Sequence, residues 1–91
     1  MCRNIRVLFH FEPPTTDDEI HAAALQYVRK VSGTTKPAAA DLAAFEKAIE
    51  EVAASTAALL HALHPRGTPR TREGEREKAR VRWARRAPGM R

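Results

Sequence analysis

The sequence predicts an all-α protein whose body is an antiparallel helical hairpin. Two segments, residues 17–32 and 37–64, carry apolar side chains at helical spacing. Only residues 33–36 separate them, and so short a turn makes neighbouring helices antiparallel. We therefore assign residues 1–64 to a helical hairpin domain. Residues 65–91 form a basic tail that we expect to be flexible or conditionally helical.

The first helix has sequence signals at both ends. Thr16 and Glu19 fit a capping box, in which each side chain binds the backbone N–H of the other residue. Gly33 suits the left-handed residue that ends a helix. Spacings of four, three and four define the face that we expect to pack on the second helix: Ile20, Ala24, Tyr27 and Val31.

Proline is favoured at the first position of a helix, so we expect the second helix over Pro37–His64. A heptad pattern runs along it through Leu42, Phe45, Ile49, Val52, Thr56, Leu59 and Leu63. With a hinge near residue 34, Ile20 would lie opposite Ile49, and Tyr27 would lie near Leu42.

The longer second helix would leave its last leucines without a facing helix. We expect a short N-terminal segment, residues 5–11, to pack across Leu59, Leu60 and Leu63. Alternating apolar residues in this segment are typical of a strand, but Asn4 also suits the cap of a short helix through Phe9. We favour the short helix, because a single strand would find no sheet partner in this fold.

Positive charge is concentrated in the tail. The whole chain has a net charge of +5, whereas residues 1–64 hold six Lys and Arg against eight Asp and Glu. Near the end, arginines surround a tryptophan: Arg80, Arg82, Trp83, Arg85 and Arg86. Phosphate pairing with arginine and base stacking on tryptophan favour nucleic acid, although an acidic membrane surface or an acidic protein also fits. Alternatively, Trp83 folds back onto a second apolar edge of the first helix, Leu25 and Val28.

Cys2 is a candidate reactive thiol. If Met1 is removed, Cys2 carries both a thiol and a free α-amine, the arrangement that an N-terminal nucleophile needs. Arg3, with Asn4 beside it, would favour the thiolate. The alternative is that Cys2 packs as a small apolar residue. No carboxylate pair in an evident cleft accompanies it, and we do not expect an enzyme.

A metal site is a further hypothesis. His61 and His64 are three residues apart at a helix end, and Cys2 would supply a third ligand for zinc or another soft metal. The alternative is that both histidines are exposed or bind the last helical carbonyls. Without such a site we expect no cofactor.

Cations and hydroxyls also gather at the turn between the two helices: Arg29, Lys30, Thr34, Thr35 and Lys36. Beside a helix N-terminus, such residues are typical of an anion-binding site. Ordinary helix capping and solvated charge explain the same residues equally well.

Several segments together carry a resemblance: Met1–Ile5, Phe11–Pro14, Ala22–Gly33 and Lys36–Pro37. They resemble a small, mostly bacterial family called domain of unknown function 2277. This sequence departs from the family at His10, where asparagine is usual, and at Thr34, where an aromatic residue is usual. The resemblance implies no activity or cofactor, but it makes the residues around Cys2 look like a family signature.

Apolar stretches are too short for a signal peptide or a transmembrane helix, so we expect a cytoplasmic protein. Of the apolar residues 17 are alanine, which predicts a thin core that a partner surface would help to stabilise. We expect an interaction or adaptor module. Its partner would be another protein, a second copy in a homodimer, or nucleic acid bound by the tail. The alternative is a thiol- or metal-dependent protein that uses Cys2.

Overall fold

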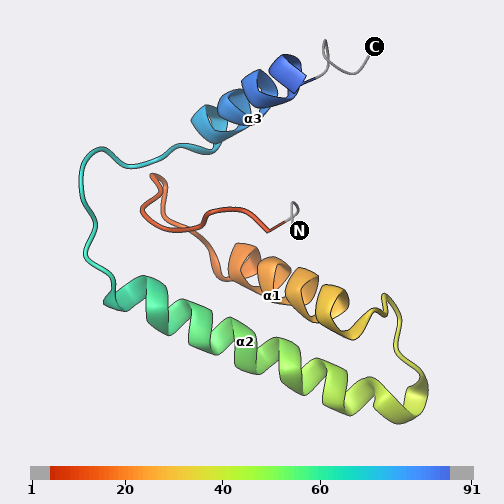
Figure 1. Ribbon diagram of the computed structural model, residues 1–91. Helices are drawn as coiled ribbons and strands as arrows, with labels where there is room; N and C mark the ends of the chain where they lie inside the picture. Colours follow the sequence, from red (N-terminus) through yellow and green to blue (C-terminus); the bar gives the residue numbers. More distant parts are fainter. Residues whose placement is uncertain (1–4, 87–91) are drawn as a thin grey trace.

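The computed structural model describes residues 5–86. Within this range it forms three α-helices and one short 3-10 turn: α1 (Asp17–Ser32), η1 (Ala39–Asp41), α2 (Leu42–Ala62) and α3 (Arg72–Arg86). Figure 1 shows α1 and α2 side by side and antiparallel, with residues 5–15 between α1 and α3. The prediction of an all-α helical hairpin is confirmed.

The predicted caps of α1 are also confirmed. The N–H of Thr16 donates to Glu19 Oε1 at 2.9 Å, and the N–H of Glu19 donates to Thr16 Oγ1 at 3.2 Å. At the other end, Gly33 has φ of +71° and its N–H binds the carbonyl of Arg29. The left-handed conformation strains any residue with a Cβ, which explains the glycine.

The buried face of α1 differs from the predicted one. Ile20, Ala24 and Val28 are buried, a spacing of four and four. Val28 is 5% exposed, whereas Val31 is 64% exposed, and Tyr27 also remains exposed. The predicted face is therefore wrong at Val31, and Tyr27 borders α2 without being buried against it. Side chains four residues apart form a ridge along a helix, and α1 packs along this ridge.

The register of the hairpin is also shifted. Ile49 clusters with Ala24 and Val28, and Tyr27 borders a hollow beside Val52. The predicted pairing of Tyr27 with Leu42 is therefore wrong, as is that of Ile20 with Ile49. The physical reason is the connection: residues 33–38 and η1 precede α2, which moves the hinge along the chain.

The predicted bounds of the second helix, Pro37–His64, are consequently wrong at both ends, because α2 spans Leu42–Ala62. It is mainly the middle residues of the heptad pattern that pack against α1. Ile49 is buried and Phe45 and Val52 pack against it, whereas Leu59 is 54% exposed. The ends of the pattern extend beyond the part of α1 that faces α2.

The N-terminal segment is not helical. Residues 5–16 form no helix, so the predicted short helix is wrong, and one isolated parallel bridge joins Phe11 to Arg70. Of the three leucines that this segment was predicted to cover, Leu59 and Leu63 stay exposed and Leu60 is half-buried. The backbone of the segment is paired instead with the residues before α3: Arg70 donates its N–H to His10, and Glu12 donates to Arg70.

The resulting molecule is flat. Its extents are 45 × 40 × 16 Å, and its radius of gyration is 15.9 Å. A compact chain of this length would have a radius of gyration of about 12 Å. In the described part of the chain only four apolar residues are buried, Ile20, Ala24, Val28 and Ile49. No helix within residues 5–86 combines the length and the apolar composition needed to cross a bilayer.

Candidate anion-binding surface on helix α3

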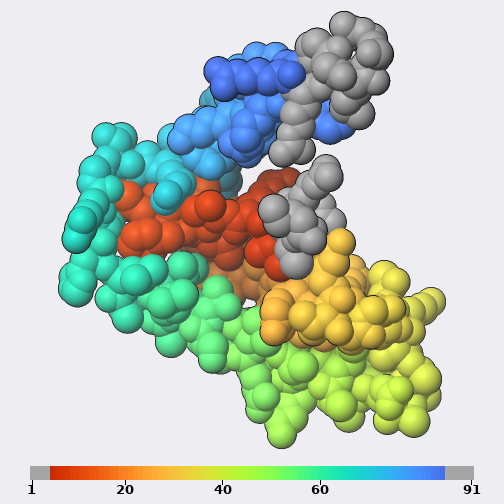
Figure 2. All heavy atoms as spheres, viewed as in Figure 1, coloured from red at the N-terminus to blue at the C-terminus, as the bar shows by residue number. Residues whose placement is uncertain are grey.

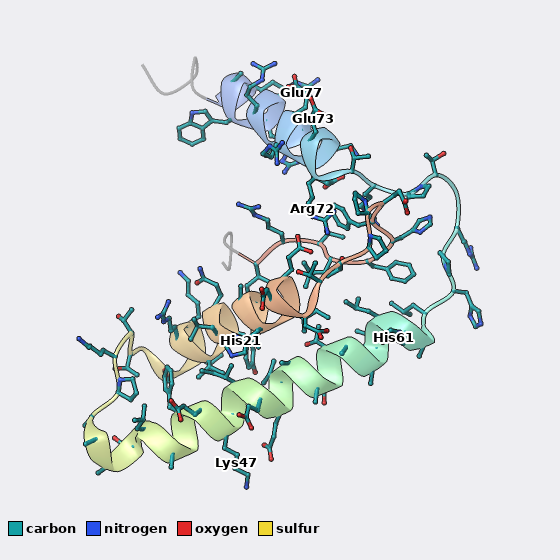
Figure 3. All side chains as sticks on the ribbon, turned by 180° about the vertical axis from the view of Figure 1, so that it is seen from behind. His21, Lys47, His61, Arg72, Glu73 and Glu77 are labelled. Atoms are coloured by element: carbon teal, nitrogen blue, oxygen red, sulfur yellow. The ribbon has the colours of Figure 1, made fainter. Side chains whose placement is uncertain are left out.

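Arg72, at the first position of α3, fastens this helix to the beginning of the chain. Its Nε and Nη2 atoms donate to the two carboxylate oxygens of Glu19, each at 2.7 Å. Nη1 and Nη2 also donate to the carbonyls of Pro13 and Pro14 at 2.8 and 3.0 Å. The guanidinium lies 5.3 Å from the ring centre of Phe11. We call these five residues the arginine clasp (Figure 3).

Arg70 adds a second set of contacts between the same two segments. Its Nη1 donates to the carbonyl of Phe9 at 2.7 Å, and its Nε lies 4.0 Å from Glu75. The ring of His10 is 3.0 Å from the carbonyl oxygen of Gly67. Residues 67–72 therefore run along residues 9–14 and determine where α3 begins. Neither Arg70 nor Arg72 was predicted from the sequence, where both lie in the charged tail of residues 65–91.

The clasp changes the acidity of Glu19. The hydrogen bonds from Arg72, together with the hydrogen bond from the N–H of Thr16, lower the pKa of the Glu19 carboxyl from 4.5 to about 2. Both partners favour the charged carboxylate. Glu19 therefore serves two elements at once, as part of the cap of α1 and as the acceptor for α3.

This pKa predicts the behaviour of the clasp in acid. Because the pKa of Glu19 is lowered on folding, the clasp stabilises the folded state fully above pH 4.5 and loses this contribution as the pH falls through about 2. Carbon-detected NMR of the Glu19 carboxyl should show its midpoint near pH 2. In the Arg72→Ala variant the midpoint should rise toward 4.5. A midpoint near 4.5 in the unaltered protein would contradict the clasp.

The charges of the rest of α3 are only partly compensated. Glu77 pairs with Arg80, which lowers the pKa of the glutamate, and Glu75 pairs with Lys78 at 3.3 Å. Arg82 and Arg85 have no carboxylate within 4.0 Å among the described residues. The last two turns of α3 therefore carry a positive surface.

The structure places the predicted nucleic-acid residues Arg80, Arg82, Trp83, Arg85 and Arg86 on these last turns of α3. Trp83 is 57% exposed. The alternative in which it folds back onto Leu25 and Val28 does not occur, because Val28 is buried and Leu25 packs in the same cluster on α2.

Comparison with protein families gives one match. The model of a family described as an uncharacterized conserved protein, DUF2277, matches residues 1–78 of the 91-residue chain. The chain belongs to the DUF2277 family. Comparisons with curated proteins and with solved structures gave no match. The matched residues of this DUF2277 protein include the whole arginine clasp, whereas Trp83 lies beyond them.

The proposed thiol and metal sites depend on residues outside the described range. Cys2, Arg3 and Asn4 precede residue 5. His61 and His64 are exposed, and among residues 5–86 no three His, Cys, Asp or Glu side chains gather as metal ligands. A reactive thiol and a zinc or other soft-metal site in this DUF2277 protein therefore stay predictions.

The predicted anion-binding residues at the turn after α1 do not lie beside the N-terminus of an α-helix, contrary to what the sequence suggested. Arg29, Lys30, Thr34, Thr35 and Lys36 surround the connection after α1, but α2 begins at Leu42 and not beside them. Within this cluster the N–H of Thr34 donates to Ser32 Oγ at 3.3 Å, which is ordinary capping. Anion binding at this turn stays a prediction.

Proposed function

We propose that this DUF2277 protein is a small binding module that holds single-stranded nucleic acid on the last two turns of α3. The observation that carries the proposal is the exposed ring of Trp83 between Arg82 and Arg85. Aromatic rings stack on bases of any sequence, and arginines neutralise the phosphates between them.

The placement of α3 supports this role. The arginine clasp holds the first turn of α3, and the helix has no extensive packing against α1 or α2 (Figure 1). A helix fixed at one end presents its other end to a partner with little loss of conformational entropy. The net charge of +5 attracts polyanions over a longer range.

An acidic protein surface is the alternative partner. The exposed Trp83 favours nucleic acid over an acidic protein. Charge pairing alone would need arginines but no exposed ring. Because residues 79–91 lie outside the family match, we assign nucleic-acid binding to this chain and not to the family as a whole.

The test measures the affinity for fluorescent oligothymidylate and oligoadenylate by anisotropy at several salt concentrations. Replacing Trp83 with Ala should lower the affinity about 5- to 100-fold, because stacking on one base is lost. Replacing Arg82 and Arg85 with Ala should reduce the slope of log affinity against log salt by about 1.4. Since Trp83 is the one tryptophan, its fluorescence should also be quenched on binding.

Lys47→Ala is the matched control, since Lys47 is an exposed cation on α2 whose one ion pair within residues 5–86 is with Glu51. Its affinity should equal that of the unaltered protein. The proposal is wrong if Trp83→Ala binds the oligonucleotides as tightly as the unaltered protein. Preferential binding of polyglutamate, unaffected by Trp83→Ala, would identify an acidic protein as the partner class.

A further inference from the structure

A cavity of about 660 Å³ lies between the N-terminal segment and the face of α3 that carries Arg72, Arg76 and Ala79. Figure 2 shows residues 5–15, in red, between α3, in blue, and the hairpin. The N-terminal segment contributes four apolar side chains to the cavity wall: Ile5, Val7, Leu8 and Phe11. The volume of the cavity falls within the range of about 300–1,000 Å³ that small-molecule sites occupy.

The charged residues of the lining are mostly arginines. Four come from α3, Arg72, Arg76, Arg80 and Arg82, and Arg6 comes from the N-terminal segment, against two glutamates, Glu19 and Glu75. Glu19 is engaged by Arg72, and Glu75 by Lys78. Arg80 is paired with Glu77, which lies outside the cavity wall.

Three of these arginines form no ion pair within residues 5–86, so their guanidinium groups can bind an anion. Arg6, Arg76 and Arg82 have no carboxylate within 4.0 Å among residues 5–86. Arg76 and Arg82, with Ala79 between them, follow a spacing of three along α3, so they lie along one side of the helix. Guanidinium groups bind carboxylate and phosphate oxygens in paired hydrogen bonds.

We infer that this cavity binds an amphipathic anion, a molecule with a hydrocarbon or aromatic body and a terminal carboxylate or phosphate. The body packs on the apolar wall, where Val7 is 50% exposed in the absence of a ligand. The anionic group binds Arg76 and Arg82. The clasp closes the base of the cavity and holds its two walls together, because Arg72 and Glu19 both line it.

Isothermal titration calorimetry of the full chain with octanoate, octyl phosphate, 1-octanol and inorganic phosphate tests this inference. Octanoate or octyl phosphate should bind saturably, and their relative affinities identify the carboxylate or the phosphate as the preferred group. 1-Octanol and inorganic phosphate should each bind at least about tenfold more weakly, since each lacks one half of the ligand. Backbone amide shifts should change in residues 5–11 and 75–82.

Two pairs of matched variants locate the site. Val7→Asp and Arg76→Ala should each weaken octanoate or octyl phosphate binding about tenfold. Val31→Asp and Arg66→Ala, at exposed positions that do not line the cavity, should leave it unchanged. Both cavity variants alter exposed side chains, so the fold should be retained, which the amide spectrum verifies.

Equal affinity for octanol and octanoate would overturn the inference, as would equal losses in the cavity and control variants. Absence of saturable binding of both anions would overturn it as well. Trp83 does not line the cavity, so Trp83→Ala should bind the anion normally. Arg82 belongs to both proposed sites, but Trp83→Ala tests only the nucleic-acid proposal and Val7→Asp tests only the cavity inference, so each can be overturned separately.

Discussion

Replacing Ile49 with Ala should lower the free energy of unfolding by about 2–5 kcal/mol. Ile49 is 6% exposed and lies at the centre of the contact between α1 and α2. Domains of this size have a total stability of only about 5–14 kcal/mol. The loss therefore amounts to a large part of what holds the hairpin together. Urea unfolding followed by far-ultraviolet circular dichroism measures it.

Two valines on α1 provide an internal comparison for the same core. Val28→Ala and Val31→Ala remove the same atoms and gain the same helix propensity, but only Val28 is buried. Val28→Ala should therefore be clearly destabilising, and Val31→Ala should be neutral or slightly stabilising. The opposite order would show that α1 packs through Val31, as the heptad-like spacing in the sequence suggested.

Replacing Arg72 with Ala should release α3 from the rest of the molecule. The substitution removes four hydrogen bonds, to Glu19, Pro13 and Pro14, and the contact with the Phe11 ring. An isolated helix of 15 residues is marginal in water, so α3 should also lose helix. Hydrogen exchange should show loss of amide protection across residues 72–86, while α1 and α2 remain protected.

Arg76→Ala is the matched control, because Arg76 occupies the next turn of α3 and makes no ion pair with the described residues. Its exchange should resemble that of the unaltered protein. Arg72→Lys should behave more like the alanine variant, since one ammonium group cannot bind both carboxylate oxygens and two carbonyls at once. Unchanged protection of α3 in Arg72→Ala would show that other contacts position it.

Local features of the fold were predictable because they depend on neighbouring residues. The capping box of Thr16 and Glu19 and the left-handed Gly33 follow from side chains within one helical turn. The buried face of α1 was less predictable. Ala24 belongs to both possible faces, so the choice between Val28 and Tyr27 depends on α2 and on a connection whose length the sequence did not reveal.

The candidate site was only partly predictable. Trp83 and the neighbouring arginines stood out by composition, and the structure leaves that tryptophan exposed. The clasp had no sequence signal, because Arg72 binds Glu19 across 53 residues and lies in a stretch of similar charges. Cys2, the candidate thiol, lies outside the described residues.

The clasp also has a consequence for the order in which the chain folds. The hairpin is made by segments joined through a short connection, whereas Arg72 and Glu19 close a loop of 53 residues. The entropy lost on closing a loop grows with the length of the loop, so forming the hairpin costs less entropy than forming the clasp. During synthesis Glu19 leaves the ribosome long before Arg72. We therefore expect the hairpin to form first and α3 to dock onto it as the last step of folding.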